Sequence, residues 1–387
     1  MRVFYVVSTR VIEGGANRSL INLISALKKL DPSFSCSALI NYEGSMADAL
    51  RELGVKCYII PFPGSMTTGR FAVEAKKWLY NFYARARIAR FMKEDKPDLV
   101  HNNSLPKTTG MEVARKLGIP YICHIRENIW DGLGGRFTFP DRVKQIVKDS
   151  ACVIAISDYI RRSYVDFTDN MDMTVLYDGI SEEDYLLPPR EILAGEKVRI
   201  LIVGVINPQK GQMDAVEAVY ELSKRGHRNI ELTILGDEGA LYYPDKLRQF
   251  IREKEMEQVR FLDHISEIGE LKALREKQDI NLICSSAEGL GRTTVESMLS
   301  GALTIAADAG ATPEIVTDME TGLLYTCRNP QSLADKIEWA MENRAEARTI
   351  AAQGRKYAAE AFSIEKYAAK VMEIYNKIIL RSADGTT

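Results

Sequence analysis

The chain has 387 residues, of which 46% are hydrophobic and 27% charged, and its formal net charge at pH 7 is −2. This length exceeds one ordinary α/β core and suits two. The charge lacks the basic excess of a nucleic-acid-binding protein, and no run of about 20 apolar residues predicts a membrane span. Six single cysteines without a C-x-x-C pair predict reduced thiols in a cytoplasmic protein.

Apolar runs of strand length alternate with amphipathic segments of helical period in the first half. Strands are predicted at residues 3–7, 35–40, 57–60, 99–101, 121–125 and 153–156. Helices separate most of them, for example at 17–30 and 70–93. This alternation predicts a parallel sheet with helices on both faces.

The same pattern restarts at residue 198 and defines a second sheet. Its strands are predicted at 198–204, 230–235, 259–262, 280–284 and 303–306. Residues 182–197, with Pro188, Pro189 and Gly195, have no strong period and are interpreted as a linker. Ligands of parallel sheets bind at the carboxyl ends of strands, so the chemistry is expected in the loops that follow them.

The loop after residue 284 carries the strongest signal for a site. Gly289 and Gly291 allow a ligand to approach the backbone closely, and a helix is predicted from Arg292 to Ser300. The N-terminus of a helix favours an anion such as a diphosphate. Glu288 and Glu296 flank this place, and carboxylates bind sugar and ribose hydroxyls. The alternative is a plain β–α turn with charges at the start of a helix.

Glu288 and Glu296 also match the E-x7-E motif of the retaining glycosyltransferases of family 4, which this chain resembles. The resemblance extends nearly end to end, and its most specific residues lie in the second half. It implies an α/β GT-B architecture, in which two Rossmann-like domains face each other across a cleft. The implied domains are an acceptor-binding domain over 1–185, a donor-binding domain over 190–362, and a final helix over 363–387 that crosses back to the first domain.

The resemblance implies roles for the loop after residue 284. Glu288 contacts the donor sugar and counts as catalytic, and Glu296 holds the ribose hydroxyls. The backbone at Arg292 and Thr293 meets the diphosphate. Gly289 and Gly291 complete this donor-binding segment.

Lys210 lies in a second loop, residues 204–211, and takes the position of a family lysine. A cation there offsets charge on the departing diphosphate, so Lys210 is a predicted catalytic residue. The family's usual arginine in this loop is replaced by Val205, and Arg292 is a candidate to compensate. The plain alternative for Lys210 is a solvated lysine at the start of a helix.

Three predictions fall in the first half of the chain. Gly14 and Gly15 follow the first strand and form a turn that can receive the donor phosphate. His124 ends a strand and resembles the family's active-site histidine, which contacts the donor sugar. Arg126 is predicted to bind an acceptor phosphate.

The resemblance implies a hexosyl or related sugar transferase that acts with retention. The donor is a nucleoside diphosphate sugar, of UDP or GDP, and the acceptor is a glycan or lipid-linked hydroxyl in cell-surface polysaccharide or glycolipid synthesis. Apart from this co-substrate no cofactor is expected, and the absence of an Asp-x-Asp pair predicts metal independence. Two alternatives stay open, a nucleotide-sugar epimerase of the same architecture and a non-catalytic module that binds sugar nucleotides.

Residues 74–93 combine six basic side chains with several aromatic ones. Such a helix could rest on anionic lipid at the inner membrane face. The alternative is a helix that packs on the sheet and exposes a solvated basic face. The sequence alone favours this second interpretation.

Overall fold

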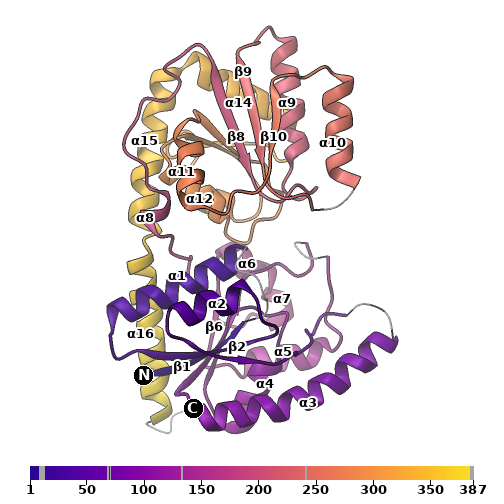
Figure 1. Ribbon diagram of the computed structural model, residues 1–387, viewed down its shortest axis with the longest axis vertical. Helices are drawn as coiled ribbons and strands as arrows, with labels where there is room; N and C mark the ends of the chain where they lie inside the picture. Colours follow the sequence, from indigo (N-terminus) through magenta and orange to yellow (C-terminus); the bar gives the residue numbers. More distant parts are fainter. Residues whose placement is uncertain (8–13, 68, 70, 132–133, 240–241, 384–387) are drawn as a thin grey trace. The chain divides into compact units, whose positions relative to one another are not determined.

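The computed structural model describes residues 1–7, 14–67, 69, 71–131, 134–239 and 242–383, and the chain forms two compact units (Figure 1). Unit 1 comprises Met1–Gly179 and Ile364–Thr387, and unit 2 comprises Ile180–Ser363. Among the described residues no helix is both long and apolar enough to cross a bilayer.

Unit 1 is a seven-stranded parallel sheet in the order β3-β2-β1-β4-β5-β6-β7. Its strands are β1 Arg2–Val7, β2 Ser35–Ile40, β3 Lys56–Ile59, β4 Leu99–Asn102, β5 Tyr121–Ile125, β6 Cys152–Ala155 and β7 Thr174–Val175. Its helices are α1 Gly15–Leu30, α2 Ser45–Glu52, α3 Phe71–Asp95, α4 Thr109–Leu117, α5 Pro140–Lys148, α6 Asp158–Ser163, α7 Val165–Thr168 and α16 Ile364–Ala383. All six predicted strands are confirmed to within one residue at each end.

The last helix, α16, belongs to unit 1 although it follows unit 2 in the chain (Figure 1). It packs on α1 and buries Tyr367, Val371 and Tyr375 in the core formed with β1. The spacing of these three residues, four apart, places them on one face of the helix. The chain therefore returns to its first unit, and this unit is completed by its last helix.

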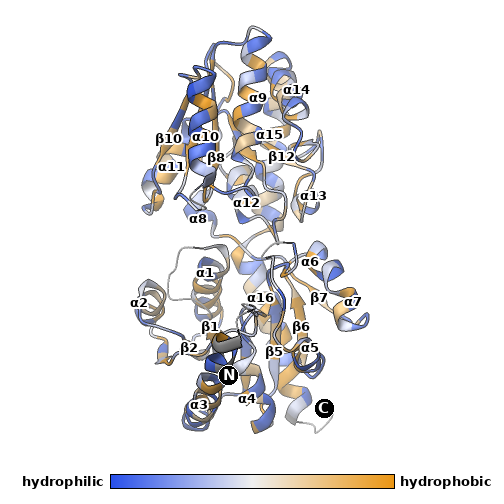
Figure 2. Cartoon of the chain, turned by 90° about the vertical axis from the view of Figure 1, so that its right-hand side faces the viewer, coloured by the Kyte–Doolittle hydropathy of each residue, from blue (hydrophilic) through white to orange (hydrophobic). Residues whose placement is uncertain are grey.

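Unit 2 is a six-stranded parallel sheet in the order β10-β9-β8-β11-β12-β13. Its strands are β8 Val198–Val203, β9 Ile230–Leu235, β10 Val259–Leu262, β11 Ile280–Ile283, β12 Leu303–Ala307 and β13 Leu323–Tyr325. Its helices are α8 Glu182–Tyr185, α9 Gln212–Lys224, α10 Tyr242–Glu253, α11 Ile268–Glu276, α12 Arg292–Leu299, α13 Thr312–Ile315, α14 Pro330–Glu342 and α15 Arg344–Ala361. In each unit the strands are the hydrophobic layer, and the helices are mixed in hydropathy (Figure 2).

The linker predicted at residues 182–197 is wrong, because this segment is a folded part of unit 2. Ile192 and Leu193 are buried in the core of the unit. Arg344 Nη1 donates to the carbonyl of Leu193 at 3.0 Å, and Arg348 Nε donates to that of Ile192 at 2.8 Å. Two arginines of α15 thus satisfy backbone carbonyls that a free linker would leave to water.

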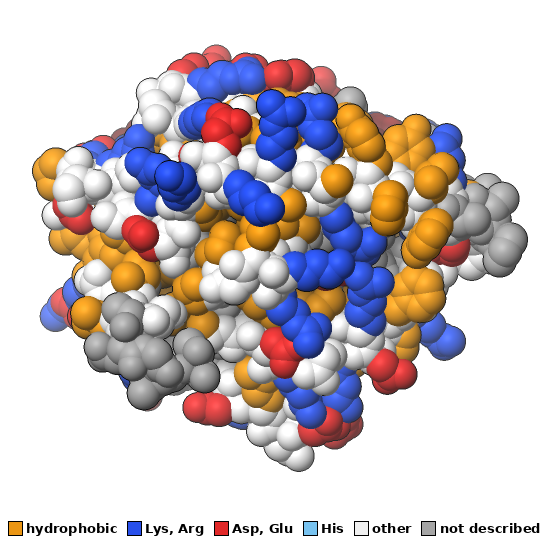
Figure 3. Space-filling model, turned by 90° about the horizontal axis from the view of Figure 1, so that it is seen from below, with side chains coloured by type: hydrophobic (Ala, Val, Ile, Leu, Met, Phe, Trp, Pro, Cys, Tyr) orange, Lys and Arg blue, Asp and Glu red, His pale blue; other side chains and the backbone are white. Residues whose placement is uncertain are grey.

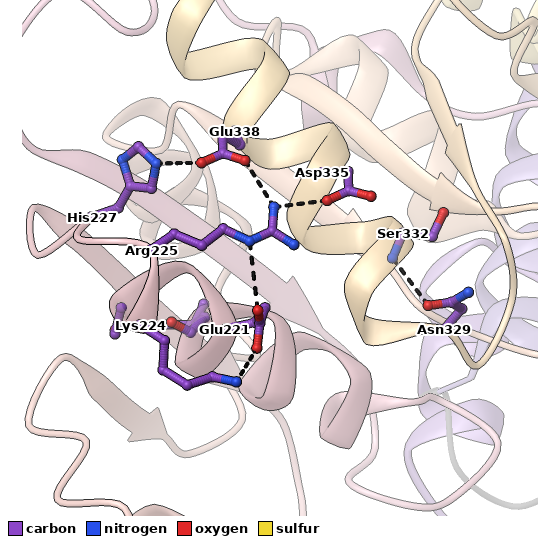
Figure 4. Close-up of polar contacts among 10 residues, drawn as sticks. Glu221, Lys224, Arg225, His227, Asn329, Ser332, Asp335 and Glu338 are labelled. Carbon is purple, nitrogen blue, oxygen red and sulfur yellow. Dashed lines mark hydrogen bonds and ion pairs between the residues drawn. The ribbon is translucent and has the colours of Figure 1, made fainter.

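A charged cluster joins α9 to α14 in unit 2 (Figure 4). Arg225 Nη1 lies 2.7 Å from Asp335 Oδ1 and 2.8 Å from Glu338 Oε2, and His227 Nε2 lies 2.6 Å from Glu338 Oε1. Partly exposed pairs of this kind contribute about 1 kcal/mol or less each. The buried apolar side chains of the two helices therefore carry most of their packing, and the cluster has a structural role.

Candidate active site

The strand order of unit 2 reverses between β8 and β11, which are neighbours in the sheet. From β8 the chain moves outward to β9 and β10, and from β11 it moves the other way to β12 and β13. Ligands of open α/β sheets bind at such a switch point, outside the carboxyl ends of the strands. The two loops that leave these ends carry Lys210 and Glu288.

Lys210 and Glu288 form an ion pair between Nζ and Oε1 at this edge of the sheet. The lysine side chain is 29% exposed and the glutamate side chain 15%. Burial alone would raise the pKa of Glu288, but the Lys210 ammonium and hydrogen bonds from Lys210 and Ser285 outweigh it and hold the pKa below its ordinary value. The predicted catalytic pair is thus a lysine beside an ionised carboxylate.

Local turn geometry positions Lys210. Asn207 Oδ1 accepts hydrogen bonds from the backbone N–H groups of Gln209 and Lys210, both at 3.0 Å. Asparagine before proline is a frequent start of such a turn, and Pro208 follows here. The Asn-Pro pair is a sequence signal for this turn, but the role of Asn207 in positioning Lys210 was not predicted.

Two glycines allow the loops around Glu288 to pack backbone against backbone. Gly211 has a φ of 68°, and a Cβ atom there would lie 2.2 Å from the carbonyl oxygen of Cys284. Gly310 has a φ of 60°, and its Cβ would lie 2.6 Å from the nitrogen of Glu288. Ala311 N donates to Glu288 O at 3.0 Å. The loop after β12 therefore fixes Glu288, a contribution that sequence reasoning missed.

We expect Gly211→Ala to destabilise the protein by about 2–4 kcal/mol, because the methyl group adds a backbone clash to the strain of a positive φ. Gly226→Ala is the matched control, since Gly226 also has a positive φ, of 99°, but its Cβ would meet nothing within 4 Å. The control is expected to cost about 1 kcal/mol. Urea unfolding of both variants measures the difference, and equal losses would refute the close packing at Gly211.

The predicted helix after Gly291 is confirmed, since α12 begins at Arg292 and is followed by Ser300 as its C-cap. Gly291 has a φ of 88°, which favours glycine, and its carbonyl accepts from the N–H of Thr294 at 2.8 Å. The first turn of a helix has N–H groups without intrahelical acceptors and carries partial positive charge. Gly289 and Thr293, both half-buried, lie at this end of the helix as predicted.

Glu296 is buried, at 8% exposure, and lies between two guanidinium groups. Its Oε2 accepts from Arg275 Nη2 at 3.3 Å, and its Oε1 lies 3.6 Å from Arg292 Nη2. Arg275 belongs to α11, is 2% exposed, and was not predicted. The Arg292 side chain, the candidate to replace the arginine absent at Val205, is thus engaged with Glu296. Val205 itself is exposed.

His124 ends β5 in unit 1 and is fully buried. Its Nδ1 lies 3.3 Å from Arg126 Nη2 and 3.2 Å from His101 Nε2. A guanidinium can only donate, so Nδ1 of His124 is an acceptor and the ring proton sits on Nε2. Burial, Arg126 and His101 together lower the pKa of His124 well below its ordinary value, so the ring is neutral.

A chain of hydrogen bonds continues from His124 into the core of unit 1. Because His124 Nδ1 accepts, His101 donates to it from Nε2, and His101 Nδ1 must accept from the Tyr375 hydroxyl at 2.6 Å. The Tyr375 oxygen then accepts from Tyr5, at 3.0 Å. His124 Nε2 is buried and finds no hydrogen-bond partner among the described residues. The network thus leaves one N–H donor unused on His124.

The pKa of His101 is lowered by burial and by Arg126 from 6.5 to about 3. Below pH 6.5 the unfolded chain takes up a proton on each of the two histidines, while the folded chain does not. The free energy of unfolding is therefore unaffected by them above pH 6.5 and falls as the pH is lowered from 6.5 toward 3. The loss is about 1.4 kcal/mol per pH unit for each histidine. Urea unfolding should therefore show about 2–3 kcal/mol less stability at pH 5.5 than at pH 7.5.

The His101→Phe variant tests the origin of this pH dependence. It removes one of the two titrating rings, so we expect it to lose roughly half as much stability between the two pH values, whatever its absolute stability. An unchanged pH dependence in this variant would contradict the burial of a neutral His101.

Arg126 does not have the accessible position expected of an acceptor-binding residue. Its side chain is 1% exposed, and its Nη1 forms a 2.6 Å ion pair with Oδ2 of Asp178, which is fully buried. Its Nε donates to Asn103 Oδ1 at 3.1 Å. These contacts give Arg126 a structural role in place of the predicted acceptor contact, because its donors are already directed into the protein.

Gly14 and Gly15 lie at the start of α1, after β1. Gly14 is the N-cap with a φ of 131°, and its carbonyl accepts from the N–H groups of Asn17 and Arg18 at 3.2 Å. Both glycines are exposed. The neighbouring Glu13 lies outside the described residues. The strand order of unit 1 also reverses between β1 and β4, and the two glycines follow β1. Their contact with the donor phosphate stays a prediction.

Comparison with known proteins shows the class of this chain. Residues 187–357 match the family model of glycosyl transferases group 1, and residues 41–184 match that of glycosyltransferase family 4. An uncharacterized glycosyltransferase of Methanocaldococcus jannaschii is 27% identical over 73% of this chain and 76% of its own length. An α-1,4-N-acetyl-D-galactosaminyltransferase of Campylobacter jejuni is 24% identical over 89% of each chain.

The fold likewise matches solved structures. Anabaena HepE in complex with UDP superposes with a TM-score of 0.80 at 19% identity, over 97% of this chain and 100% of that one. Two parallel Rossmann-like units with this likeness define the GT-B fold, and the family models make the protein a glycosyltransferase, an enzyme of sugar transfer. The chain belongs to the family-4 type of glycosyltransferases.

Proposed function

We propose that this enzyme transfers a hexosyl or related sugar from a nucleoside diphosphate sugar, of UDP or GDP, to an acceptor hydroxyl with retention of anomeric configuration. The observation that carries the proposal is the Lys210–Glu288 ion pair at the β8/β11 switch point, beside the N-terminus of α12. A lysine and a helix N-terminus attract a diphosphate, and a carboxylate binds sugar hydroxyls.

The donor contacts follow from this arrangement and the family motif. The diphosphate meets the backbone at Arg292 and Thr293 and shares the Lys210 ammonium with Glu288. Glu288 accepts hydrogen bonds from the sugar hydroxyls. Glu296, oriented by Arg275 at 3.3 Å, accepts them from the ribose.

We also propose roles for three residues of unit 1. The family resemblance assigns phosphate contacts to Gly14 and Gly15 and a contact with the donor sugar to His124, whose buried Nε2 proton is left unused by the network with Arg126 and His101.

In the proposed reaction the bond between the anomeric carbon and the diphosphate oxygen breaks. A bond from the same carbon to the acceptor oxygen forms on the same face, and the departing phosphate takes the acceptor's proton. Negative charge grows on the diphosphate as it leaves. The Lys210 ammonium and the α12 N-terminus stabilise this charge in place, so no metal ion is needed in the proposal.

The acceptor is proposed to be a glycan or lipid-linked hydroxyl in the synthesis of a cell-surface polysaccharide or glycolipid. The name of the Campylobacter relative includes an undecaprenol diphosphate glycan as its substrate. This supports a lipid-linked acceptor as the first class to test.

The experiment follows the products by NMR when the protein is given each nucleotide sugar, UDP-sugars first, with and without a mixture of acceptors. Transfer or slow donor hydrolysis releases the nucleoside diphosphate, and the first-formed product keeps the donor's anomeric configuration. An inverted product would contradict retention. A nucleotide sugar with an altered sugar would indicate the epimerase alternative, and an unchanged donor that binds would indicate a non-catalytic module.

A further inference from the structure

The helix α3 of unit 1 has apolar side chains on both of its faces. Its inner face buries Ala84, Ile88 and Met92, which are four residues apart, and the helix packs on α4. A surface helix with one such stripe is expected to expose a polar opposite face. The described side chains of α3 depart from this rule in its N-terminal half.

The outer face of that half exposes a cluster of aromatic and aliphatic side chains. Of fifteen exposed large hydrophobic residues in the described chain, six lie between residues 73 and 83. They are Val73, Trp78, Leu79, Tyr80, Phe82 and Tyr83, with exposures of 37%, 58%, 63%, 46%, 67% and 57%. This concentration differs from the single exposed hydrophobic residues that are normal on a protein surface. We call these six residues the α3 apolar patch.

The patch extends beyond a single row of the helix. The rings of Trp78 and Phe82 stack with centroids 6.4 Å apart. Trp78 also lines a shallow pocket with Phe139, the exposed residue that precedes α5. Leaving apolar surface in water is unfavourable by about 25 cal/mol per Å². A cluster of exposed apolar side chains of this size therefore indicates a partner that removes it from water.

The charge of α3 identifies the kind of partner. The helix carries six basic residues and three acidic ones, whereas the whole chain has a net charge of −2. The acidic residues are engaged: Glu74 with Lys77 at 3.2 Å, Glu94 with Lys56 at 2.8 Å, and Asp95 as a buried acceptor. The exposed basic residues on the helix are Lys76, Arg87, Arg90 and Lys93.

The view of unit 1 from below shows how these side chains gather (Figure 3). Hydrophobic side chains cluster toward the right, where the N-terminal half of α3 lies in Figure 1, and Lys and Arg side chains lie beside them toward the middle of the same face. A basic helix with Trp, Tyr and Phe on its exposed side has the composition of interfacial membrane helices, because aromatic rings favour the headgroup level and Lys and Arg attract anionic lipid.

We infer that the outer face of α3 docks on an anionic membrane surface. The α3 apolar patch enters the headgroup region, and the basic residues of the helix lie over lipid phosphates. A second copy of the chain is a poorer partner, since it would bring the same positive face against itself. The inference does not need the proposed reaction, but it would place the enzyme where a lipid-linked acceptor is found.

The test is flotation of the full chain with vesicles of phosphatidylcholine alone and with about a third of phosphatidylglycerol. We expect binding to the anionic vesicles, at least 10-fold weaker binding to the neutral ones, and release by about 0.5 M salt, because surface electrostatics are screened there. The double variant Leu79→Ser/Phe82→Ser should lower binding at least 10-fold. Leu380→Ser is the matched control, because Leu380 is 66% exposed on α16, and it should bind as the parent does.

A second measurement on the same variants, the rise in Tm on addition of a nucleotide sugar, separates this inference from the proposed function. Leu79→Ser/Phe82→Ser should keep the shift, since neither residue lies in the candidate active site. A parent that fails to bind anionic vesicles, or a double variant that binds them equally well, would overturn the membrane inference. Sedimentation that shows a dimer dissociated by the double variant would assign the patch to a second copy and would also overturn it.

Discussion

Lys210→Ala is expected to lower kcat for sugar transfer by about 10²–10³-fold, the usual cost of removing one preorganised group that stabilises transition-state charge. Lys210 is the cation that the β8 loop directs to the switch point, and its contact with Glu288 is a direct ion pair. Steady-state release of the nucleoside diphosphate measures the effect. Because the charge grows mainly as the diphosphate departs, the loss should fall more on kcat than on KM.

Lys224→Ala is the control for this prediction. Lys224 ends α9, which follows the same loop, but it is more exposed and pairs with Glu221 of its own helix. It should keep the parent's kcat. An unchanged kcat in Lys210→Ala would remove Lys210 from the catalytic machinery.

A double-mutant cycle with Glu288→Gln tests whether the two residues act as one pair. Removing Lys210 leaves the Glu288 carboxylate without the cation that holds its pKa down. The effects of the two single changes should therefore not add, and the double variant should be only slightly worse than the worse single one. Simple additivity would show that the ion pair has no functional coupling.

Asp178→Asn is expected to destabilise the protein by about 3–5 kcal/mol, because it leaves the buried guanidinium of Arg126 without its counter-charge. The two side chains are 1% and 0% exposed, and the pair is 2.6 Å long. Arg126 also donates to Asn103 and contacts His124, so a displaced Arg126 should disturb the position of this histidine as well. Chemical denaturation of the protein, followed by circular dichroism, measures the change in the free energy of unfolding.

Glu43→Gln provides the matched surface control. Glu43 pairs with Arg51 at 2.9 Å, but the two side chains are 62% and 45% exposed. Its loss should cost less than about 1 kcal/mol. If Asp178→Asn were as mild as this control, the buried pair would not be the support of His124 that its geometry indicates.

The sequence predicted the two sheets well because their central strands are continuous apolar runs buried on both faces. It missed β7, of two residues, and β13, of three, since runs of this length carry no period. It also took residues 182–197 for a linker. Their prolines and glycine do break helix and strand, but Ile192 and Leu193 pack in unit 2 through contacts with α15, far away in the chain.

The candidate site could be predicted in part for a similar reason. Glu288, Gly291 and Lys210 follow strand ends, so their local pattern fixes their position. Arg275 and His101 were missed because each acts through a partner distant in sequence, Glu296 and His124 respectively. Burial of Arg126 could not be foreseen either, since it depends on Asp178, 52 residues later.

The exposed face of α3 shows a further limit of sequence patterns. The helix does pack through one stripe, as predicted, but its outer face is more than a solvated basic surface. Trp78 and Phe82 could each have been core residues, but the helix packs on α4 and leaves both side chains exposed.

The most direct test of the proposed donor site is a thermal-shift titration of the protein with UDP-, GDP-, ADP- and dTDP-sugars, beside the Glu296→Ala variant. A ligand that binds only the folded state raises Tm by mass action. We expect a rise with one nucleotide that is reduced in the variant, because Glu296 of α12 is the proposed ribose contact. No rise with any nucleotide, in protein shown to be folded, would contradict the donor site and with it the proposed reaction.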